Sequence, residues 1–375
     1  MLPGATLGVL GGGQLGRMMA LAARRMGYRI IVLDPSASCP TGQVADGVVV
    51  GALDDDDAAL ELASQVDVVT LDTEHVPYSI LERIEQTTPV RPGSAVLRTI
   101  QDRLTQKQFL DKLGLPQAKW APASEDLTAL AATVADLGGH AILKARHAGY
   151  DGKGQVRLDS ASDLEAARGR IRHASAVVEE VVPFVREISV ILARAVDGDI
   201  KIYPIAENVH HRHILHTTRA PAPMTGDGRT RAETIACTIA RALDHVGVMA
   251  VELFELADGR LLVNEIAPRT HNSGHYTYGA AATSQFEQHV RAIAGLPLGD
   301  TRALSGAVML NLIGDLWAKG PPPWQHVMAH PEARLHLYGK AAPAPGRKMG
   351  HVLFLDDDTD RALASAEAVL AALTP

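Results

Sequence analysis

Short apolar runs alternate with amphipathic stretches over the first hundred residues of the chain. The predicted strands are Leu7–Leu10, Tyr28–Leu33, Val48–Val50 and Val66–Leu71. Helical periodicity between them predicts helices over Gln14–Met26 and Ala58–Ala63. Strands that alternate with helices in this way are typical of a parallel sheet covered by helices. We therefore expect residues 1–102 to form an α/β domain.

The pattern changes after residue 102, where predicted strands outnumber helices. These strands are Ala141–Ala145, Val177–Val182, Glu187–Arg194, Lys201–Ile205, Met249–Leu256 and Arg260–Ile266. Short turns such as Asp197-Gly198 and Asp258-Gly259 join several of them and favour antiparallel pairing. A second change near Pro297 leads into a small region that closes with an Ala-rich helix from Asp360. We expect an α+β centre at residues 103–297 and a third domain at residues 298–375.

Composition and charge narrow the function classes. The 375 residues are 46% hydrophobic and 21% charged, which supplies apolar surface for several cores and excludes a disordered chain. The net charge is −7 without a long basic block, so neither nucleic acid nor a membrane surface is an expected partner. No apolar run reaches the roughly 18 residues of a membrane span. The two cysteines lack paired spacing, which indicates neither disulfides nor a zinc site and favours a cytoplasmic location.

The first predicted strand runs into Gly11-Gly12-Gly13-Gln14-Leu15-Gly16, which satisfies the G-x-G-x-x-G pattern between a strand and a helix. Gly11 would close the turn, and Gly13 would let a phosphate approach the free N–H groups of the helix. Asp34 ends the next strand, where a ribose-binding acid would lie. Three alternatives stay open: an NAD-dependent dehydrogenase, a site for another phosphate-bearing or small ligand, or a tight turn and nothing more.

A second glycine-rich loop, at residues 148–155, follows the predicted strand that contains Lys144. This loop leads into another strand and contains no Gly-Lys-Ser/Thr, so it is not a Walker loop. We interpret it as a hairpin lid whose backbone N–H groups close over phosphates while Lys144 supplies a positive charge from beneath. The alternative is an ordinary hairpin beside an edge-strand lysine.

Two glutamates fall on facing strands of a predicted hairpin. A two-residue turn at Asp258-Gly259 would place Glu252 directly opposite Glu265. Like charges at facing positions destabilise a sheet, so a cation between them is expected, and Mg²⁺ is the natural choice. Asn264 points to the other face unless a bulge interrupts the alternation. The alternative is a pair of solvent-facing acids on an edge hairpin.

Polar residues follow Glu265 in the run Arg269-Thr270-His271-Asn272-Ser273-Gly274-His275. Arginine and histidine beside a metal carboxylate suit an anionic reaction intermediate. The other histidine cluster, His210, His211, His213 and His216, could suggest zinc, but no cysteine or carboxylate completes a fourfold set. We favour a contact between one of these histidines and a ligand.

Five motifs along the chain are specific in combination. They are Gly11–Met18, Asp102–Lys107, Gly149–Gln155, His271–Tyr276 with Thr283–Glu287, and Gly346–His351. Together they resemble the ATP-grasp superfamily and, within it, the N5-carboxyaminoimidazole ribonucleotide synthases of purine biosynthesis. The resemblance covers nearly the whole chain. It implies a Rossmann-like amino-terminal domain that holds substrate rather than NAD, a central ATP-grasp domain and a small carboxy-terminal domain.

The resemblance also implies a reaction. Bicarbonate would attack the γ-phosphate of ATP to give carboxyphosphate, and the amine of 5-aminoimidazole ribonucleotide would capture its carboxyl group or the CO₂ released from it. ATP and Mg²⁺ would be required, and similar enzymes are usually homodimers. A related alternative is the formate-using ATP-grasp enzyme that formylates glycinamide ribonucleotide.

Residue roles follow from the same resemblance. Expected at the nucleotide are Arg103, Lys107, Lys144, Gly149, Tyr150, Asp151, Gly152, Lys153, Gly154, Gln155, Glu179, Glu180, Val181, Val182, Glu187, His210, Asn264 and Glu265. Among these, residues 179–182 would form the adenine hinge and Glu187 would bind the ribose. Expected to hold magnesium are Glu252 and Glu265.

The remaining expected residues serve the carboxyl transfer and the ribotide. The catalytic set is Asp151 as base for the amine, with Arg269, His271 and Lys348. The ribotide set is Gln14, Glu74, Tyr150, Lys340, Arg347 and Lys348. Thr270 stands where similar enzymes often have proline, so the sequence leaves the orientation of His271 open.

Overall fold

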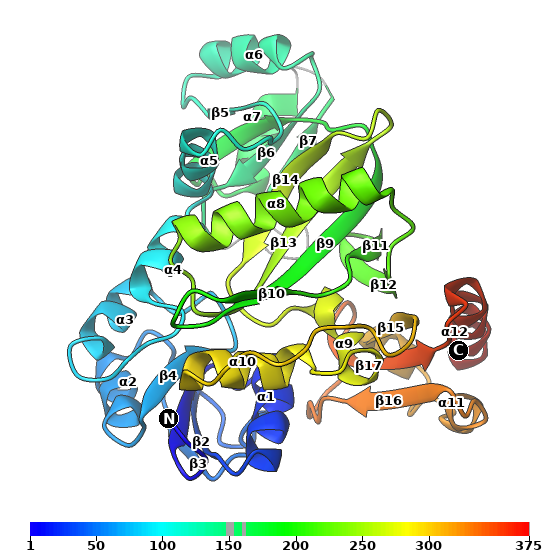
Figure 1. Ribbon diagram of the computed structural model, residues 1–375. Helices are drawn as coiled ribbons and strands as arrows, with labels where there is room; N and C mark the ends of the chain where they lie inside the picture. Colours follow the sequence, from blue (N-terminus) through cyan, green and yellow to red (C-terminus); the bar gives the residue numbers. More distant parts are fainter. Residues whose placement is uncertain (148–153, 160–162, 375) are drawn as a thin grey trace.

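A computed structural model describes residues 1–147, 154–159 and 163–374 (Figure 1). The amino-terminal region is a four-stranded sheet with the order β3-β2-β1-β4, and every neighbouring pair is parallel, as predicted. Its strands are β1 (Thr6–Leu10), β2 (Arg29–Asp34), β3 (Gly47–Val50) and β4 (Val68–Leu71). Its helices are α1 (Gln14–Arg25), α2 (Asp56–Ala63), α3 (Tyr78–Ile84) and α4 (Ser94–Ile100).

Both faces of this sheet are covered. Alternate residues of β1 and β2, such as Leu7 and Ile30, pack against α1, while the opposite residues, such as Leu10 and Ile31, pack against α2 and α3. The helix α10 (Gln285–Ala294) belongs to a distant part of the chain but adds Phe286 to the α1 side of this core. The amino-terminal region is therefore joined to the centre by buried apolar contacts.

A smaller antiparallel sheet has the strand order β5-β8-β6-β7. Its strands are β5 (Trp120–Pro122), β6 (Ala141–Ala145), β7 (Gln155–Leu158) and β8 (Ala176–Glu180), and the neighbouring helices are α5 (Arg103–Lys112), α6 (Leu127–Asp136) and α7 (Leu164–Arg170). Strands β6 and β7 pair antiparallel, with Lys144 opposite Gln155. This confirms the strand–loop–strand setting of the glycine-rich segment.

The largest sheet contains nine strands among the described residues, in the order β14-β13-β9-β11-β12-β15-β17-β16 with β10 beside β9. The strands are β9 (Phe184–Arg194), β10 (Ile200–Ile202), β11 (Ala206–His211), β12 (Ile214–Ala220), β13 (Gly247–Leu256), β14 (Leu261–Ala267), β15 (Ala307–Ile313), β16 (Ala333–Leu337) and β17 (Lys348–Leu355). The predicted antiparallel centre is confirmed. Because β12 pairs with β15, the sheet continues across the expected boundary at residue 297.

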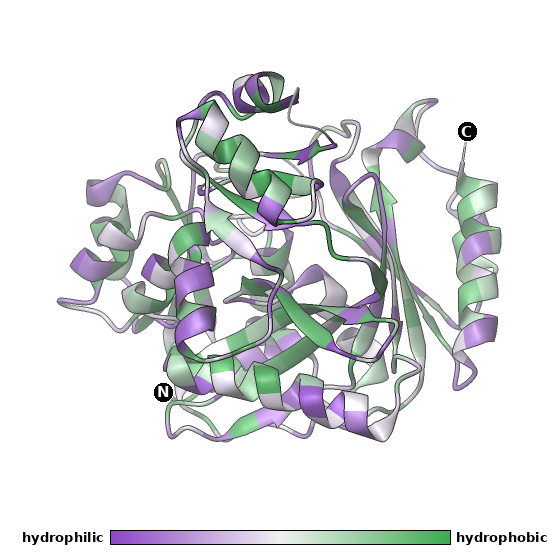
Figure 2. Ribbon diagram, turned by 90° about the horizontal axis from the view of Figure 1, so that it is seen from above, coloured by the Kyte–Doolittle hydropathy of each residue, from purple (hydrophilic) through white to green (hydrophobic). Residues whose placement is uncertain are grey.

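Helices pack along this large sheet and at its end. They are α8 (Gly226–Ala242), α9 (Thr277–Ala280), α10, α11 (Gln325–Met328) and α12 (Thr359–Leu373), with short 3₁₀ helices η2 (Asn272–Gly274) and η3 (Gly314–Trp317). Figure 2 shows hydrophobic and hydrophilic residues interspersed along α12, the helix that ends at the C-terminus. Its buried residues, among them Ala362 and Val369, pack against Val308 and Val352 of the sheet.

The hairpin β13–β14 corrects one prediction. The turn is not a two-residue turn: Leu256 N–H donates to Arg260 O at 2.9 Å, next to the pairing of Glu255 with Leu261. Ala257, Asp258 and Gly259 therefore form a three-residue loop, in which Gly259 has a φ of 81°. The register then shifts between Glu252 and Leu253, which restores the predicted pairing of Glu252 with Glu265. The pairing was predicted correctly from an incorrect turn, because a bulge compensates for the extra loop residue.

Three predicted strands are shorter than expected. Strand β4 begins at Val68 rather than Val66. Strand β10 ends at Ile202 rather than Ile205, because Pro204 has no N–H to donate to a ladder. Strand β8 ends at Glu180, so Val181 and Val182 lie in the connection to β9.

Candidate active site

The glycine loop after β1 binds carboxylates of the protein itself. Gly12 N–H donates to Asp34 Oδ2 at 2.8 Å. The N–H groups of Gly13 and Gly16 donate to Asp72 Oδ2 and Oδ1 at 3.0 and 2.5 Å. A Cβ at Gly13 would lie 2.4 Å from Asp72 Oδ2, so glycine is required here by close approach. Three of the N–H groups that a pyrophosphate would use already have acceptors in the protein, which argues against the dinucleotide interpretation of this loop.

Two of the predicted phosphate-binding lysines lie deep in the molecule and share one carboxylate. Glu179 Oε2 is 2.9 Å from Lys144 Nζ and 3.3 Å from Lys107 Nζ, and none of the three residues is more than 6% exposed. Burial by itself would raise the pKa of Glu179, but the charges of the two lysines lower it to about 2. The three charged side chains therefore carry one net positive charge.

The segment predicted as an adenine hinge, residues 179–182, begins with the glutamate that pairs with these two lysines. The side chain of Glu179 is engaged with the lysines, and Glu180 Oε1 accepts from Lys119 N–H at 2.8 Å. Val181 and Val182 lie beyond the end of β8. The main chain of these residues, rather than the glutamate side chains, is thus the part that suits a nucleotide base.

Glu252 and Glu265 lie directly opposite each other on β13 and β14. The bulge makes Asn264 the extra residue of β14, and both Asn264 and Glu265 are half-buried between two buried neighbours. Strict alternation is broken there, which brings the amide and the carboxylate to the same face. Burial and the charge of Glu265 raise the pKa of Glu252. A cation between the two carboxylates would remove this repulsion.

The predicted ribose acid and a predicted nucleotide histidine are neighbours. Glu187 Oε2 on β9 lies 3.0 Å from His210 Nδ1 on β11. Burial lowers the pKa of His210, but Glu187 raises it by more, and the net pKa is above its usual value. Over the described residues, no group of three or more His, Cys, Asp and Glu side chains is arranged to hold a metal ion. The zinc alternative for the histidine cluster therefore finds no support.

Arg269 forms a two-pronged ion pair with Glu74, 195 positions earlier in the chain. Arg269 Nη2 donates to Glu74 Oε1 at 2.8 Å, its Nε contacts Oε2, and its Nη1 donates to Thr270 O at 3.0 Å. Burial would raise the pKa of Glu74, but Arg269 lowers it to about 2. The structure thus brings together a predicted ribotide residue and a predicted bicarbonate residue.

His271 lies beside the two glutamates with its ring oriented by a serine. Its Nδ1 is 2.8 Å from Ser273 Oγ and accepts from Ser273 N–H at 3.3 Å, and its Nε2 is 3.7 Å from Glu252 Oε1. Burial and the neighbouring charges of Arg269 and Lys348 lower the pKa of His271 to about 3. The ring is therefore neutral, and because Nδ1 accepts, Nε2 carries the hydrogen.

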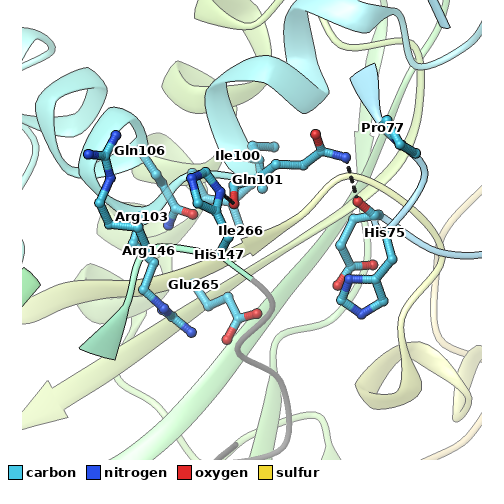
Figure 3. A pocket seen from close by; sticks show the side chains of 11 residues that line it. His75, Pro77, Ile100, Gln101, Arg103, Gln106, Arg146, His147, Glu265 and Ile266 are labelled. Carbon is cyan, nitrogen blue, oxygen red and sulfur yellow. Dashed lines mark hydrogen bonds between the residues drawn. The ribbon is translucent and has the colours of Figure 1, made fainter. Parts of the chain in front are cut away.

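A cavity of about 440 Å³ is lined by residues of the amino-terminal region and the centre. Figure 3 shows Glu265 between Arg146 on one side and His75 on the other, with Arg103 above Arg146. Arg146 is held by Asp102, whose Oδ1 accepts from Arg146 Nε at 2.9 Å. Two arginines and a carboxylate that suits a metal in one cavity fit a phosphoryl group with its counter-ion.

The three predicted ribotide cations near the carboxy terminus have different surroundings. Lys348, the first residue of β17, acts electrostatically on Glu252 and His271. Lys340 Nζ lies 5.8 Å from the centre of the Tyr338 ring and acts on Asp72. Arg347 is exposed and donates to Ala342 O at 2.7 Å. Lys348 thus lies toward the acid pair and Lys340 toward the glycine loop.

Other predicted residues lie at the edges of the site or outside the described part of the chain. Gln14 is the half-buried first residue of α1. Gly154 O accepts from Ala145 N–H at 2.7 Å, beside the pairing of Gln155 with Lys144. The lid residues Gly149, Tyr150, Asp151, Gly152 and Lys153 lie outside the described residues.

Sequence reasoning missed three residues of this region. Asp72 follows β4, and the carboxyl ends of adjacent parallel strands meet at one edge, so its approach to the glycine loop could have been inferred. Arg146 directly follows the strand of Lys144, which is a weaker signal. Gln285 on α10 contacts His271 from a distant helix; it lies within the Thr283–Glu287 motif, but no role was predicted for its side chain. No helix in the described ranges is both long and apolar enough to cross a bilayer.

Family models match three consecutive parts of the chain. Residues 4–101 match the ribonucleotide synthetase preATP-grasp domain, residues 108–286 the ATP-grasp domain, and residues 307–365 the phosphoribosylaminoimidazole carboxylase C-terminal domain. Together they bear out the predicted fold class, an ATP-grasp fold with an amino-terminal parallel-sheet domain and a carboxy-terminal domain.

Relatives match along nearly the full length. The N5-carboxyaminoimidazole ribonucleotide synthase of Brucella melitensis is 49% identical over 352 residues, which is 93% of this chain and 96% of that protein. The Bacillus subtilis enzyme of the same name is 40% identical over 361 residues, 96% of this chain and 93% of that protein.

Solved structures agree with these relatives. The Aspergillus clavatus synthase in complex with ADP and 5-aminoimidazole ribonucleotide is 33% identical, with a TM-score of 0.92 and coverage of 100% of this chain and 99% of that chain. An ADP complex of an N5-carboxyaminoimidazole ribonucleotide synthetase is 43% identical, with a TM-score of 0.93 and coverage of 99% and 97%.

Proposed function

The chain belongs to the N5-carboxyaminoimidazole ribonucleotide synthase family of ATP-grasp ligases, and from this premise we propose how its residues divide the work. The enzyme carboxylates 5-aminoimidazole ribonucleotide to N5-carboxyaminoimidazole ribonucleotide at the expense of ATP, in purine biosynthesis. One observation carries the assignment of roles: the carboxylates of Glu252 and Glu265 face each other, and Glu265 lines the cavity that Arg103 and Arg146 also line.

We assign Glu252 and Glu265, with Asn264 beside them, to Mg²⁺. Carboxylate and amide oxygens are suitable ligands, and the repulsion that raises the pKa of Glu252 would be relieved by a cation. Two carboxylates and an amide leave coordination positions for water and phosphate oxygens, which is usual for magnesium bound with a nucleotide. Bound Mg²⁺ would neutralise charge on the transferred phosphoryl group.

We assign the phosphates of ATP to Arg103 and Arg146 at the cavity and to Lys144 and Lys107 beneath the hairpin. The lysine pair keeps one net positive charge after pairing with Glu179, which suits a polyanion. The main chain of residues 179–182 would bind the base, and Glu187 beside His210 would bind the ribose hydroxyls. These side chains bind and orient the nucleotide rather than move protons.

Bicarbonate is the proposed source of the carboxyl group. One of its oxygens attacks the γ-phosphorus, the bond from that phosphorus to the β-phosphate bridge breaks, and ADP and carboxyphosphate result. His271 is neutral with hydrogen on Nε2, so it can donate to a developing negative charge without itself competing as a base. Arg269 is fixed by Glu74 at the same edge and supplies positive charge there.

The ribotide is assigned to Gln14, Glu74 and Lys340, which lie toward the glycine loop and its Asp72, and to Lys348, with Arg347 at the surface. The amine attacks the carboxyl carbon of carboxyphosphate, or CO₂ released from it, and phosphate leaves. Asp151, which lies outside the described residues, remains our proposal for the base that takes the amine proton, with Tyr150 beside it.

A phosphate-release assay tests this division. Purified protein with ATP, Mg²⁺ and bicarbonate should release phosphate when 5-aminoimidazole ribonucleotide is added, and not when formate and glycinamide ribonucleotide replace bicarbonate and the ribotide. An absence of ribotide-stimulated release would contradict the proposal. Release supported by formate and glycinamide ribonucleotide would instead favour the formylating relative.

Domain boundaries and assembly are part of the same proposal. We keep the divisions 1–102, 103–297 and 298–375, although strand pairing between β12 and β15 makes the last division one of chain segments rather than of separate sheets. A homodimer is proposed because the family resemblance of the sequence implies one. Light scattering coupled to size-exclusion chromatography would measure the mass in solution.

A further inference from the structure

The loop that carries His271 is held by one buried side chain from another helix. Gln285, the first residue of α10, is 0% exposed. Its Oε1 accepts from His271 N–H at 3.0 Å, and its Nε2 donates to His271 O at 2.7 Å. A single amide group thus satisfies both main-chain polar groups of His271, in the way that a neighbouring strand would.

The fit of this amide leaves little room for another arrangement. Gln285 Nε2 also lies 3.3 Å from His275 Nδ1, and Gln285 N–H donates to Thr277 Oγ1 at 2.9 Å. A Cβ at Gly274 would be only 2.4 Å from Gln285 Oε1 and 2.9 Å from its Nε2. The loop from His271 to His275 therefore surrounds the glutamine amide. Only glycine at position 274 lets the main chain come this close to the amide, because any Cβ would overlap it.

The ring of His271, unlike its main chain, faces the two glutamates of the proposed active site. Ser273 fixes Nδ1, as described above, and Nε2 points toward Glu252 at 3.7 Å from its Oε1. Gln285 makes its contacts with the main chain of His271 and with its neighbours in the loop. A displacement of this main chain would move the ring relative to the glutamates. A misplacement of about 1 Å at a reacting centre can lower the reaction rate about 100-fold.

We propose that Gln285 is a positioning residue that fixes His271 for carboxyl transfer by binding both main-chain polar groups of that histidine. The inference rests on the proposed function, in which His271 addresses bicarbonate and carboxyphosphate. It goes beyond that function because it gives Gln285, which is assigned to no substrate, an effect on kcat. It also predicts that this effect depends on His271.

The chain offers a matched control on the same helix. Gln288, one turn along α10, is also 0% exposed, and its amide binds both main-chain groups of Gly299, with Oε1 accepting at 2.7 Å and Nε2 donating at 2.9 Å. A purely structural role would make the two glutamines equivalent. Gln285→Met and Gln288→Met each remove two hydrogen bonds to a main chain with little change in volume, and Gln285→Met also removes the longer contact with His275, so both should lower the melting temperature, Gln285→Met by the same amount or slightly more.

Steady-state kinetics separates the two glutamines. Gln285→Met should lower kcat about 10- to 100-fold, with the KM for ATP unchanged, because only the position of His271 is altered. Gln288→Met should keep kcat within about twofold. Equal kcat values for the two variants would overturn the proposal.

A double-mutant cycle tests whether Gln285 acts through His271. Once His271→Ala has removed the ring, adding Gln285→Met should lower kcat no further. A multiplicative loss in the double variant would overturn the proposal. If His271→Ala keeps wild-type kcat, the assignment of His271 in the proposed function fails as well, whereas an inactive His271→Ala with a fully active Gln285→Met refutes the positioning role alone.

A second perturbation covers the case in which Gln285→Met does not fold. Gly274→Ala leaves the glutamine in place but puts a methyl group against its amide, so it should reproduce the loss of kcat without a change in the KM for ATP. Unchanged kcat in a folded Gly274→Ala protein, with melting temperature measured in parallel, would count against the proposal.

Discussion

The glycine loop and the β13–β14 hairpin are both places where carboxylates gather, and they differ in what the carboxylates meet. In the loop, Asp72 accepts from two backbone N–H groups at the amino end of α1. On the hairpin, Glu252 meets another carboxylate, that of Glu265. The first arrangement is complete within the protein, while the second is destabilising until something positive is added.

This difference distinguishes carboxylates that stabilise the fold from carboxylates that we propose bind a ligand. A loop with the pattern of a phosphate site has its donors occupied by an internal anion, so it serves the packing of β1, β4 and α1. A pair of acids with no sequence motif of its own is the stronger indication of a ligand. Unmatched charge among buried side chains is more informative here than a glycine pattern.

The largest effect is expected from Glu265→Gln. The substitution removes the negative charge of a proposed magnesium ligand without changing side-chain volume, so ribotide-stimulated phosphate release should fall about 10³-fold or more. Stability should change little or rise, since the like-charge repulsion with Glu252 disappears. Phosphate release and thermal melting measure the two quantities.

Glu255→Gln is the control on the same hairpin. Glu255 pairs with Arg186 at 3.2 Å rather than with another acid, and we expect its substitution to spare turnover. If Glu265→Gln lost turnover and stability in parallel, the acid pair would, like the carboxylates at the glycine loop, serve mainly to stabilise the fold.

Asp72→Asn tests the other side of the comparison. The asparagine amide would turn a donor toward the N–H groups of Gly13 and Gly16, and the free energy of unfolding should fall by about 2–4 kcal/mol. Urea denaturation measures this loss. Asp67→Asn, which affects a single bond to Thr6 N–H, should cost less. Saturable NAD(H) binding, by the wild type or by this variant, would contradict the structural interpretation of the loop.

The Glu74–Arg269 pair predicts a dependence on acid pH. The pKa of Glu74 is lowered from 4.5 to about 2 in the folded protein, so its ionised form stabilises the fold above pH 4.5. That contribution, on the order of 3 kcal/mol, should be lost as the pH falls from about 4.5 toward 2. Glu74→Gln should flatten this part of the profile, measured by urea unfolding at several pH values. An unchanged acid slope would show that the pair contributes no such stability.

The smallest effect is expected from Lys348→Ala. If this lysine grips the ribotide, its loss should raise the KM for ribotide about tenfold and leave the KM for ATP unchanged. A raised KM for ATP alone would assign Lys348 to the nucleotide beside Glu252 instead. Lys201→Ala, which removes an exposed lysine 3.8 Å from Asp199, serves as the control.

Local patterns were sufficient for much of the fold. Period-two alternation and helical periodicity repeat within a few residues, so the parallel sheet and the antiparallel centre were predicted correctly. Turn chemistry was less reliable, since the loop at Asp258 and Gly259 has one residue more than expected. Pairing of Glu252 with Glu265 survived because the bulge at Asn264 offset that residue.

By itself, the sequence determined the order of strands and helices, the motifs of an ATP-grasp ligase and most of the charged residues assigned to its site. Tertiary structure alone decided which of those charges meet. Asp72 reaches the glycine loop 59 positions away, Lys144 shares Glu179 with Lys107, and Arg269 pairs with Glu74 across 195 positions. Periodicity reports only neighbours along the chain, whereas burial and electrostatic pairing depend on distances that exist once the sheets have packed together.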